Sequence, residues 1–143
     1  MRRLLRFLGR LLLFAVVLVV LAGGVGWLWL RGATLPQHSG RLALKGLMAP
    51  VEVLREPGGV VHLKAQSEED LFFALGVVHA QDRLWQMEFQ RRVGAGRLSE
   101  VVGAATLSQD KFLRTWGFYR AAEQGYAGLS PEGKAIVDAY VAG

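Results

Sequence analysis

The fold of this chain is decided by the stretch ALGVVHAQDRLWQMEFQRRVGAGRLSEVVG, residues 74–103. Just before it, Ser67-Glu68-Glu69-Asp70 combines an N-cap hydroxyl with three acids, which satisfies free backbone N–H groups and complements a helix dipole. The glycines Gly94 and Gly96 come near its end. We therefore predict a long helix from Ser67 to about Arg92. Its apolar positions are Leu71, Leu75, Val78, Leu84, Trp85, Met87 and Phe89.

Working outward, β-branched residues on both sides of Pro57-Gly58-Gly59 predict a β-hairpin over residues 51–65. After the long helix we expect a short helical segment over residues 97–102, closed by Gly103. A further helix, capped by Thr106 or Ser108, carries Phe112, Leu113 and Trp116. The last helix opens at Ser130-Pro131-Glu132, with proline where its missing N–H does no harm. The predicted class is α+β, a hairpin followed by four or so helices.

The N-terminus has the pattern of a membrane-directed segment. Arg2, Arg3, Arg6 and Arg10 precede residues 11–30, which carry no charge and would span about 30 Å as a helix, the thickness of the hydrocarbon layer. The basic end should stay in the cytoplasm, so the sequence predicts export to the periplasmic or extracellular face. Residues 22–24 (Ala-Gly-Gly) suit a signal peptidase, and both a cleaved signal and a retained anchor remain open.

These segments give three predicted regions: a signal peptide or membrane anchor over residues 1–31, a linker over 32–50, and an incomplete domain over 51–143. The linker mixes Gly, Pro, Ser and Lys with short apolar pieces and has no steady periodicity, although an edge strand near Leu42–Leu44 is compatible with it.

Charge and composition exclude several classes of protein. The formal net charge is +5, but residues 32–143 hold eight Arg and four Lys against twelve acids, so the excess lies in the leader and at Arg31. A neutral exported part has no electrostatic footprint for nucleic acid, and we predict no nucleic-acid partner. Cysteine is absent, which excludes disulfides, thiolate metal sites and a cysteine nucleophile in this chain.

Residues that could carry chemistry are few. His38, His62 and His79 have no second histidine at metal-binding spacing, and a hydrolase built on His79 and Asp82 lacks a nucleophile. Within the long helix, spacing allows Asp82–Gln86 and Glu88–Arg91/Arg92 pairs on a solvated face; alternatively, Asp82 and Arg83 enter a buried network that holds a larger assembly in register. The aromatic residues either form core or line an acyl pocket; they are Phe72, Phe73, Trp85, Phe89, Phe112 and Trp116.

Residues 74–103 resemble the penicillin acylase (penicillin amidase) family of N-terminal-nucleophile hydrolases. The resemblance rests on one ungapped set that includes Gly76, Gln81, Asp82, Arg83, Gln86, Glu88, Arg91, Arg92 and Gly96. The hairpin and the segments after residue 103 are similar too, so everything after the linker is covered, as the N-terminal part of the family's α-chain region. Pro57 in the turn and Val61 before His62 depart from the family pattern and concern turn geometry.

The resemblance implies part of an αββα fold and an exported precursor that cleaves itself into α and β chains. The new β-chain serine then hydrolyses linear amides such as penicillins or N-acyl homoserine lactones. No Gly-Ser, Gly-Thr or Gly-Cys junction occurs here, so we expect the nucleophile beyond Gly143 and no activity from this chain alone. The motif residues named above are then structural. Calcium, the β-chain region and the amide substrate belong to the full-length protein. The alternative is a membrane-anchored helical module that binds a partner without catalysis.

Overall fold

The computed structural model describes residues 2–143, with side chains from Arg6 onward. The chain divides into two compact units, residues 1–40 and Arg41–Gly143. Each unit is described by itself below.

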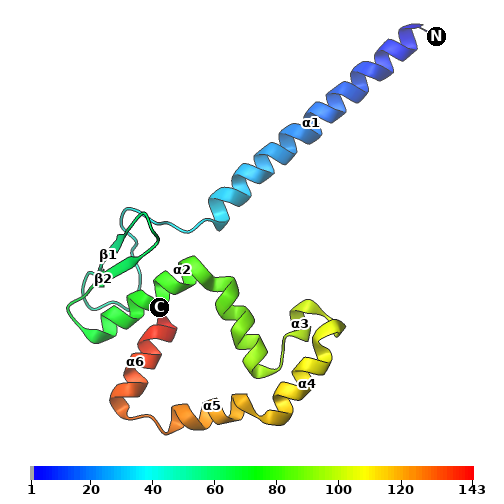
Figure 1. Ribbon diagram of the computed structural model, residues 1–143. Coiled ribbons are helices and arrows are strands. Elements are labelled where there is room, and N and C mark those ends of the chain that lie inside the picture. Colours follow the sequence, from blue (N-terminus) through cyan, green and yellow to red (C-terminus); the bar gives the residue numbers. More distant parts are fainter. Residues whose placement is uncertain (1) are drawn as a thin grey trace. The chain divides into compact units, whose positions relative to one another are not determined.

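The first unit consists mainly of one helix, α1 (Arg2–Thr34), drawn in blue to cyan in Figure 1. Over residues 6–34 its mean hydropathy reaches 2.7 in the most apolar window, and none of that window is buried within the protein. The helix continues three residues beyond Arg31, and the Thr34 hydroxyl donates to the Leu30 carbonyl at 2.7 Å. The helix is long and apolar enough to cross a membrane, and a signal sequence meets the same criterion.

The second unit opens with the predicted hairpin. Strands β1 (Glu52–Arg55) and β2 (Val61–Lys64) pair antiparallel, with Val53 opposite Leu63. The turn closes through the Glu56 amide, which donates to the Val60 carbonyl at 2.9 Å, and Gly59 adopts a φ of 85° that favours glycine. The expected strand near Leu42–Leu44 is wrong, because these residues form no ladder and lead instead into a turn at Lys45–Gly46.

Helix α2 (Glu68–Ala95) confirms the predicted long helix and its start. The Ser67 side chain accepts from the Asp70 amide at 3.1 Å. At the other end Gly96 takes a left-handed conformation with φ 63°, and its amide donates to the Arg92 and Val93 carbonyls. The prediction did not include the kink at Arg83, where φ −141° and ψ 20° interrupt the helical geometry.

The remaining elements are α3 (Ser99–Val102), the 3-10 turn η1 (Ala104–Thr106), α4 (Leu107–Trp116), α5 (Phe118–Ala127) and α6 (Pro131–Ala142). The predicted starts of α3, α4 and α6 are within two residues, and Ser130 caps α6 by accepting from the Gly133 amide at 3.1 Å. Thr106 precedes α4, but its hydroxyl donates back to the Gly103 carbonyl, so the expected cap hydrogen bond is not formed. Helix α5 is an element that the prediction did not separate.

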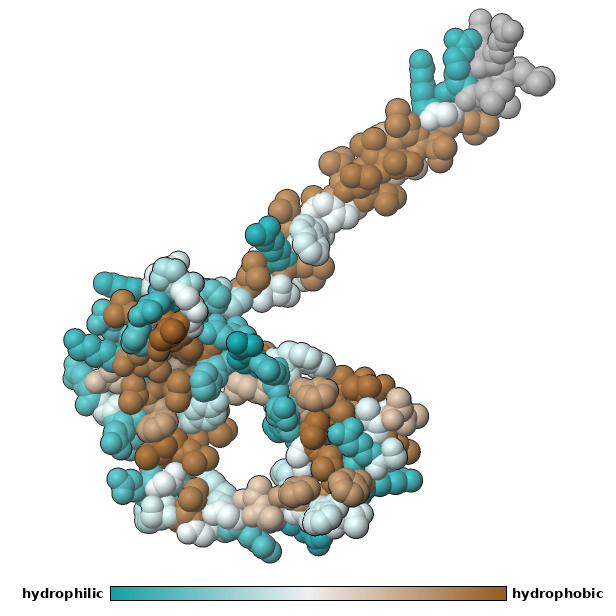
Figure 2. Space-filling view, in the orientation of Figure 1, coloured by the Kyte–Doolittle hydropathy of each residue, from teal (hydrophilic) through white to brown (hydrophobic). Residues whose placement is uncertain are grey.

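The helices of this unit lead away from the C-terminal end of α2 and return along α5 and α6, so that α6 packs on the first half of α2 (Figure 1). The space-filling view shows an opening enclosed by these helices (Figure 2). Among the described residues, the buried apolar side chains are Phe73, Ala74, Val78 and Leu98. A core of this size is small for 103 residues, and many large apolar side chains of the unit stay exposed.

Candidate functional site

Gly76 lies at a close approach of α2 and α6. It is buried, and a Cβ atom built on it would overlap the carbonyl oxygen of Tyr140 in α6. Gly143 meets Phe73 of α2 in the same way. Two helices can approach this closely only where one of them lacks a side chain, so the glycine of the motif sets the distance between α2 and α6.

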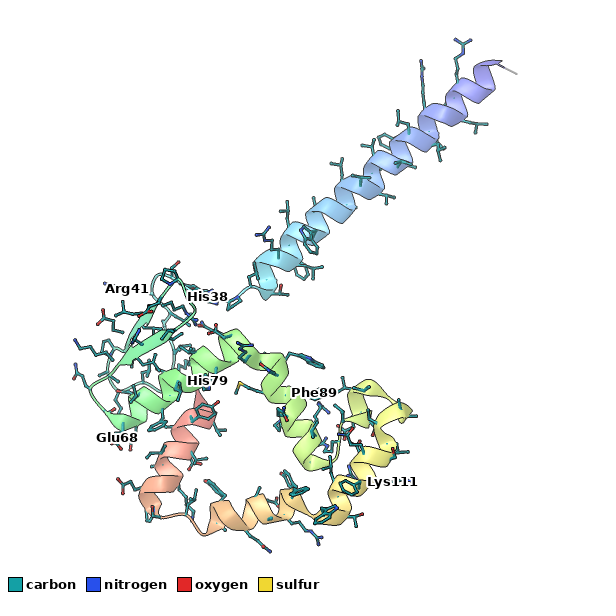
Figure 3. All side chains as sticks on the ribbon, viewed as in Figure 1. His38, Arg41, Glu68, His79, Phe89 and Lys111 are labelled. Carbon is teal, nitrogen blue, oxygen red and sulfur yellow. The ribbon has the colours of Figure 1, made fainter. Side chains whose placement is uncertain are left out.

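His79 points toward α6, one turn after Gly76 (Figure 3). Its Nδ1 lies 2.9 Å from the Tyr140 hydroxyl, and the two rings meet edge to face with centroids 5.7 Å apart. Asp82 is engaged elsewhere, with Arg55, so these contacts do not support a catalytic pair of His79 and Asp82. His79 instead adds a polar contact to the α2–α6 interface.

Asp82 and Gln81 connect α2 to the hairpin. Arg55 of β1 donates to both Asp82 carboxylate oxygens, at 3.0 and 2.7 Å, and to Gln81 Oε1 at 3.0 Å. The Arg55 and Asp82 side chains are 20% and 28% exposed, so this bidentate pair is partly shielded from water. Asp82 therefore holds a strand 27 residues earlier in the chain, whereas spacing alone had paired it with Gln86. Arg83 and Gln86 are exposed and lie 3.4 Å apart.

Glu88 receives hydrogen bonds from two arginines of its own helix, Arg91 at 2.8 Å and Arg92 at 2.6 Å, as the spacing predicted. Arg92 also reaches Glu100 of α3 at 2.6 Å, and Glu100 accepts from Arg97 at 2.7 Å. These five residues form an ion-pair ladder that links the last turns of α2 to α3. The link to α3 could not be read from spacing within one helix.

Two buried aspartates hold loops by their backbone, and the sequence analysis missed both roles. Asp70, 1% exposed, accepts from the amides of Met48 at 2.8 Å and Ala49 at 3.0 Å. Asp110 of α4, 3% exposed, accepts from the amides of Leu98 at 2.9 Å and Ser99 at 2.7 Å. Each carboxylate satisfies two consecutive N–H groups, which fixes the segment before the hairpin and the start of α3 respectively.

The ladder and the Asp110 clamp perturb the titration of their acids. Hydrogen bonds from Arg91 and Arg92 outweigh partial desolvation and lower the pKa of Glu88, and Arg97 and Arg92 lower the pKa of Glu100 likewise. Burial alone would raise the pKa of Asp110, but hydrogen bonds from Ser99 and Leu98 and the charge of Arg114 outweigh it and lower the pKa.

This arrangement predicts acid lability at the α2–α3–α4 corner. A carboxyl whose pKa is lower in the folded state contributes stability above its unfolded pKa, and that contribution disappears as pH falls through the folded value. We expect amide protection in α3 and the end of α2 to be level from pH 7 to about 5 and to fall below about pH 4. Hydrogen exchange across this range measures it. In the Glu88→Gln/Glu100→Gln variant, amide protection should fall less below about pH 4 than in the unchanged chain. A pH profile of protection identical to that of the unchanged chain would contradict the role of these two acids.

The expectation that the aromatic residues form a core is right for Phe73 and wrong for three others. Trp85, Phe112 and Trp116 are 63%, 58% and 64% exposed, whereas Phe72 and Phe89 are half-buried. Phe112, Trp116 and Phe118 form a row, with ring centroids 6.0 and 6.3 Å apart and the last two rings stacked. This aromatic row crosses the turn between α4 and α5.

The unit also has two open grooves. One, of about 370 Å³, lies between residues 46–48, the first two turns of α2, and the middle and last turns of α6. The other, of about 250 Å³, lies between the end of α2 and the α4–α5 turn. Neither of these grooves is lined by a serine, threonine or histidine. An acyl pocket with its own nucleophile is therefore not assembled in either groove.

Comparison with known proteins identifies the motif. The sequence model described as penicillin amidase matches residues 50–143, which are the hairpin and all the helices after it. The chain belongs to the penicillin amidase family. The match begins one residue after the Met48–Ala49 segment that Asp70 holds, and it includes every residue of the ion-pair ladder.

Relatives in this family are much longer than the chain. A penicillin acylase 2 proenzyme from a Pseudomonas species is 45% identical over 111 residues, 78% of this chain and 14% of that protein. The acyl-homoserine lactone acylase QuiP of Pseudomonas aeruginosa is 40% identical over 127 residues, 88% of this chain and 15% of that protein. The chain thus spans about one seventh of the length of the curated relatives it matches.

A solved structure is also similar. The thermostable penicillin G acylase from Alcaligenes faecalis superposes with a TM-score of 0.57 at 33% identity, covering 64% of this chain and 49% of that one. The α+β arrangement described above is therefore similar to the penicillin acylase fold.

Several side chains of this chain that have nucleophile or ligand chemistry have structural roles or belong to different parts of the chain. Ser67 and Ser130 cap helices, and Ser99 begins α3. His62 is exposed and contacts Glu56 at 2.7 Å, and His38 belongs to the N-terminal unit. Over residues 2–143, no group of three or more His, Asp or Glu side chains is placed to hold a metal ion.

Proposed function

We propose that this chain is the N-terminal part of an amidohydrolase precursor that cleaves linear amides, such as the acyl side chains of penicillins or N-acyl homoserine lactones. The observation that carries the proposal is the penicillin amidase match over residues 50–143, supported by relatives named for both activities. The resemblance further implies a serine nucleophile at the start of a β chain and a partial αββα fold. The nucleophile would come from a later region of the precursor.

In this proposal the motif residues have structural roles. Gly76 sets the α2–α6 distance, and Gln81 and Asp82 hold the hairpin to α2 through Arg55. Arg83 lies at the kink of α2 and Gln86 three residues after it, and both side chains are exposed, where a neighbouring region would be able to contact them. The ladder residues Glu88, Arg91 and Arg92 fix the turn into α3.

The partner of this chain would be the remainder of its own precursor. Large apolar side chains exposed on α2, α4 and α5 include Leu84, Trp85 and the aromatic row Phe112, Trp116 and Phe118. Monomeric proteins rarely leave contiguous apolar patches of this kind open. Since the matched residues make up only 14% of the length of the penicillin acylase 2 proenzyme, a β-chain region in a precursor of that length would be long enough to cover these surfaces.

Calcium, which the family resemblance implies for the full-length protein, does not fit the described residues. Hard cations take six to eight oxygen ligands, and the buried carboxylates Asp70 and Asp110 are already occupied by backbone amides. A calcium site would have to draw most of its ligands from the later regions.

We further propose that residues 32–143 are exported. The basic cluster before residue 11 and the apolar span of α1 favour translocation of everything after Arg31. A periplasmic or extracellular location follows, in which the enzyme meets amides from outside the cell.

The proposal is tested by comparing this chain with the product of the uninterrupted gene. We expect the longer product to release the acyl group from an N-acyl amide such as penicillin G or an N-acyl homoserine lactone, and the 143-residue chain to release none. Activity of the short chain would contradict the placement of the nucleophile. Inactivity of a folded, self-cleaved longer product towards all amides tested would contradict the proposed hydrolysis of linear amides.

A further inference from the structure

The apolar span of α1 is bracketed by arginines at both ends. Arg10 and Arg31 enclose the uncharged residues 11–30, whose helical length of about 30 Å equals the hydrocarbon thickness of a bilayer. Figure 2 shows a largely hydrophobic helix between hydrophilic ends. The side chains of residues 6–34 are almost all exposed, as they would be against lipid. A secretory signal needs an apolar region of only about 7 to 15 residues.

The small residues that suit a signal peptidase lie inside this span. Gly24 is 14 residues from Arg10, about 21 Å along the helix, and about 10 Å short of Arg31. The helix continues without interruption through residues 22–24 and on to Thr34. With Arg10 at one face of the hydrocarbon, the bond after Gly24 would lie below the opposite face, in helical backbone whose hydrogen bonds are expensive to open in lipid.

The end of the helix has the residues of a membrane interface. Trp27 and Trp29 precede Arg31, and tryptophan is enriched where hydrocarbon meets the headgroups. The Thr34 hydroxyl donates to the Leu30 carbonyl one turn earlier, within the last turn of the helix. If the chain were cut after Gly24, the mature protein would begin with the six apolar residues Val25–Leu30.

We propose that α1 is retained as a membrane-spanning anchor whose partner is the lipid bilayer, so that residues 41–143 act at the outer face of the cytoplasmic membrane. The inference rests on the proposed export for its orientation and is independent of the amide hydrolysis. The four arginines before residue 11 would then lie against the anionic lipids of the cytoplasmic leaflet.

The test is to produce the chain with its own leader in a Gram-negative host and to separate soluble periplasm from membranes washed with alkaline carbonate. We expect the protein in the washed membranes, with an intact mass that includes residues 2–24. Recovery from the periplasm with Val25, or any later residue of the span, as its first residue would overturn the anchor.

A matched variant, Ala22→Leu/Gly24→Leu, replaces the small residues that a signal peptidase requires and adds apolar surface within the span. The anchor predicts the same fraction and the same N-terminus as the unchanged chain. A wild-type chain that is soluble while this variant stays in the membrane would show that cleavage is the normal fate. Protease added to spheroplasts separates the anchor proposal from the export proposal. If the chain is in the membrane but its residues 41–143 resist digestion, the anchor stands and the export is contradicted.

Discussion

Replacing Gly76 by alanine is expected to destabilise the packing of α6 on α2 by about 3 kcal/mol, the upper end of the range for overpacking. The added Cβ would overlap the Tyr140 carbonyl oxygen, and this obstacle is backbone, so it cannot turn aside as a long side chain can. Alanine otherwise stabilises a helix relative to glycine by roughly 0.5–1 kcal/mol, so helix propensity alone predicts that Gly76→Ala is stabilising.

Gly94→Ala is the matched control for this variant. Gly94 is in the same helix, and a Cβ built on it meets nothing within 4 Å. We expect it to be neutral or stabilising. Pulse proteolysis of the detergent-purified chain, scored at cleavage sites in α6, measures the effect of both variants. A loss of about 3 kcal/mol of stability corresponds to roughly a hundredfold rise in the population in which α6 is open to cleavage. Equal behaviour of the two variants would contradict the close approach of α2 and α6.

Asp70→Ala should have an effect of similar size on the segment before the hairpin. The substitution removes two charge-assisted hydrogen bonds and leaves the amides of Met48 and Ala49 without their acceptor in a partly buried place. Leaving a buried donor unpaired costs about 1–3 kcal/mol for each group, so we expect a loss of about 3 kcal/mol. Hydrogen exchange at these two amides and urea denaturation followed by circular dichroism measure it.

Glu69→Ala provides the control, because it removes the same charge from the same helical turn while its side chain is exposed. Its effect should be limited to the helix-dipole contribution, about 0.3–1 kcal/mol. Asp70→Asn, which keeps one acceptor oxygen, should be intermediate. If Glu69→Ala were as destabilising as Asp70→Ala, the role assigned to the carboxylate clamp would be wrong.

The features that sequence analysis predicted depend on neighbours within four residues. The Ser67 cap, the end of the helix at the Gly94 and Gly96 pair, and the Glu88 pairs are local in this sense, and the structure has all three. The hairpin turn is also local, and Pro57-Gly58-Gly59 marked its position. Such contacts can be read from spacing because the helix or turn itself brings the groups together.

The features that were missed depend on partners far away in the chain. Asp70 was read as a first-turn acid, although its amide donors come 21 and 22 residues earlier. The kink at Arg83 has neither proline nor glycine to announce it, and it directly follows the residue that binds Arg55. Helix α5 is an exception, because it begins after Gly117, whose φ of 75° turns the chain, and this glycine is a local signal that the prediction did not use.

The exposed aromatic residues were misjudged for a related reason. For Trp85, Phe112 and Trp116 a core position was favoured over the lining of an acyl pocket, because aromatic side chains at helical spacing more often belong to a core, yet all three are exposed. The chain corresponds to about one seventh of its relatives, so in the proposed precursor the partners of these side chains would belong to another region. Pattern analysis identified which side chains are apolar, and it could not supply the surface that covers them.

The central claim, that these residues open an amidohydrolase precursor, is tested most directly by the coding DNA beyond the codon for Gly143. The account predicts that the frame continues for several hundred codons and contains a junction of a small residue with serine, at which the translated product cleaves itself. A stop codon directly after Gly143, with a protein of this length in the cell, would contradict it.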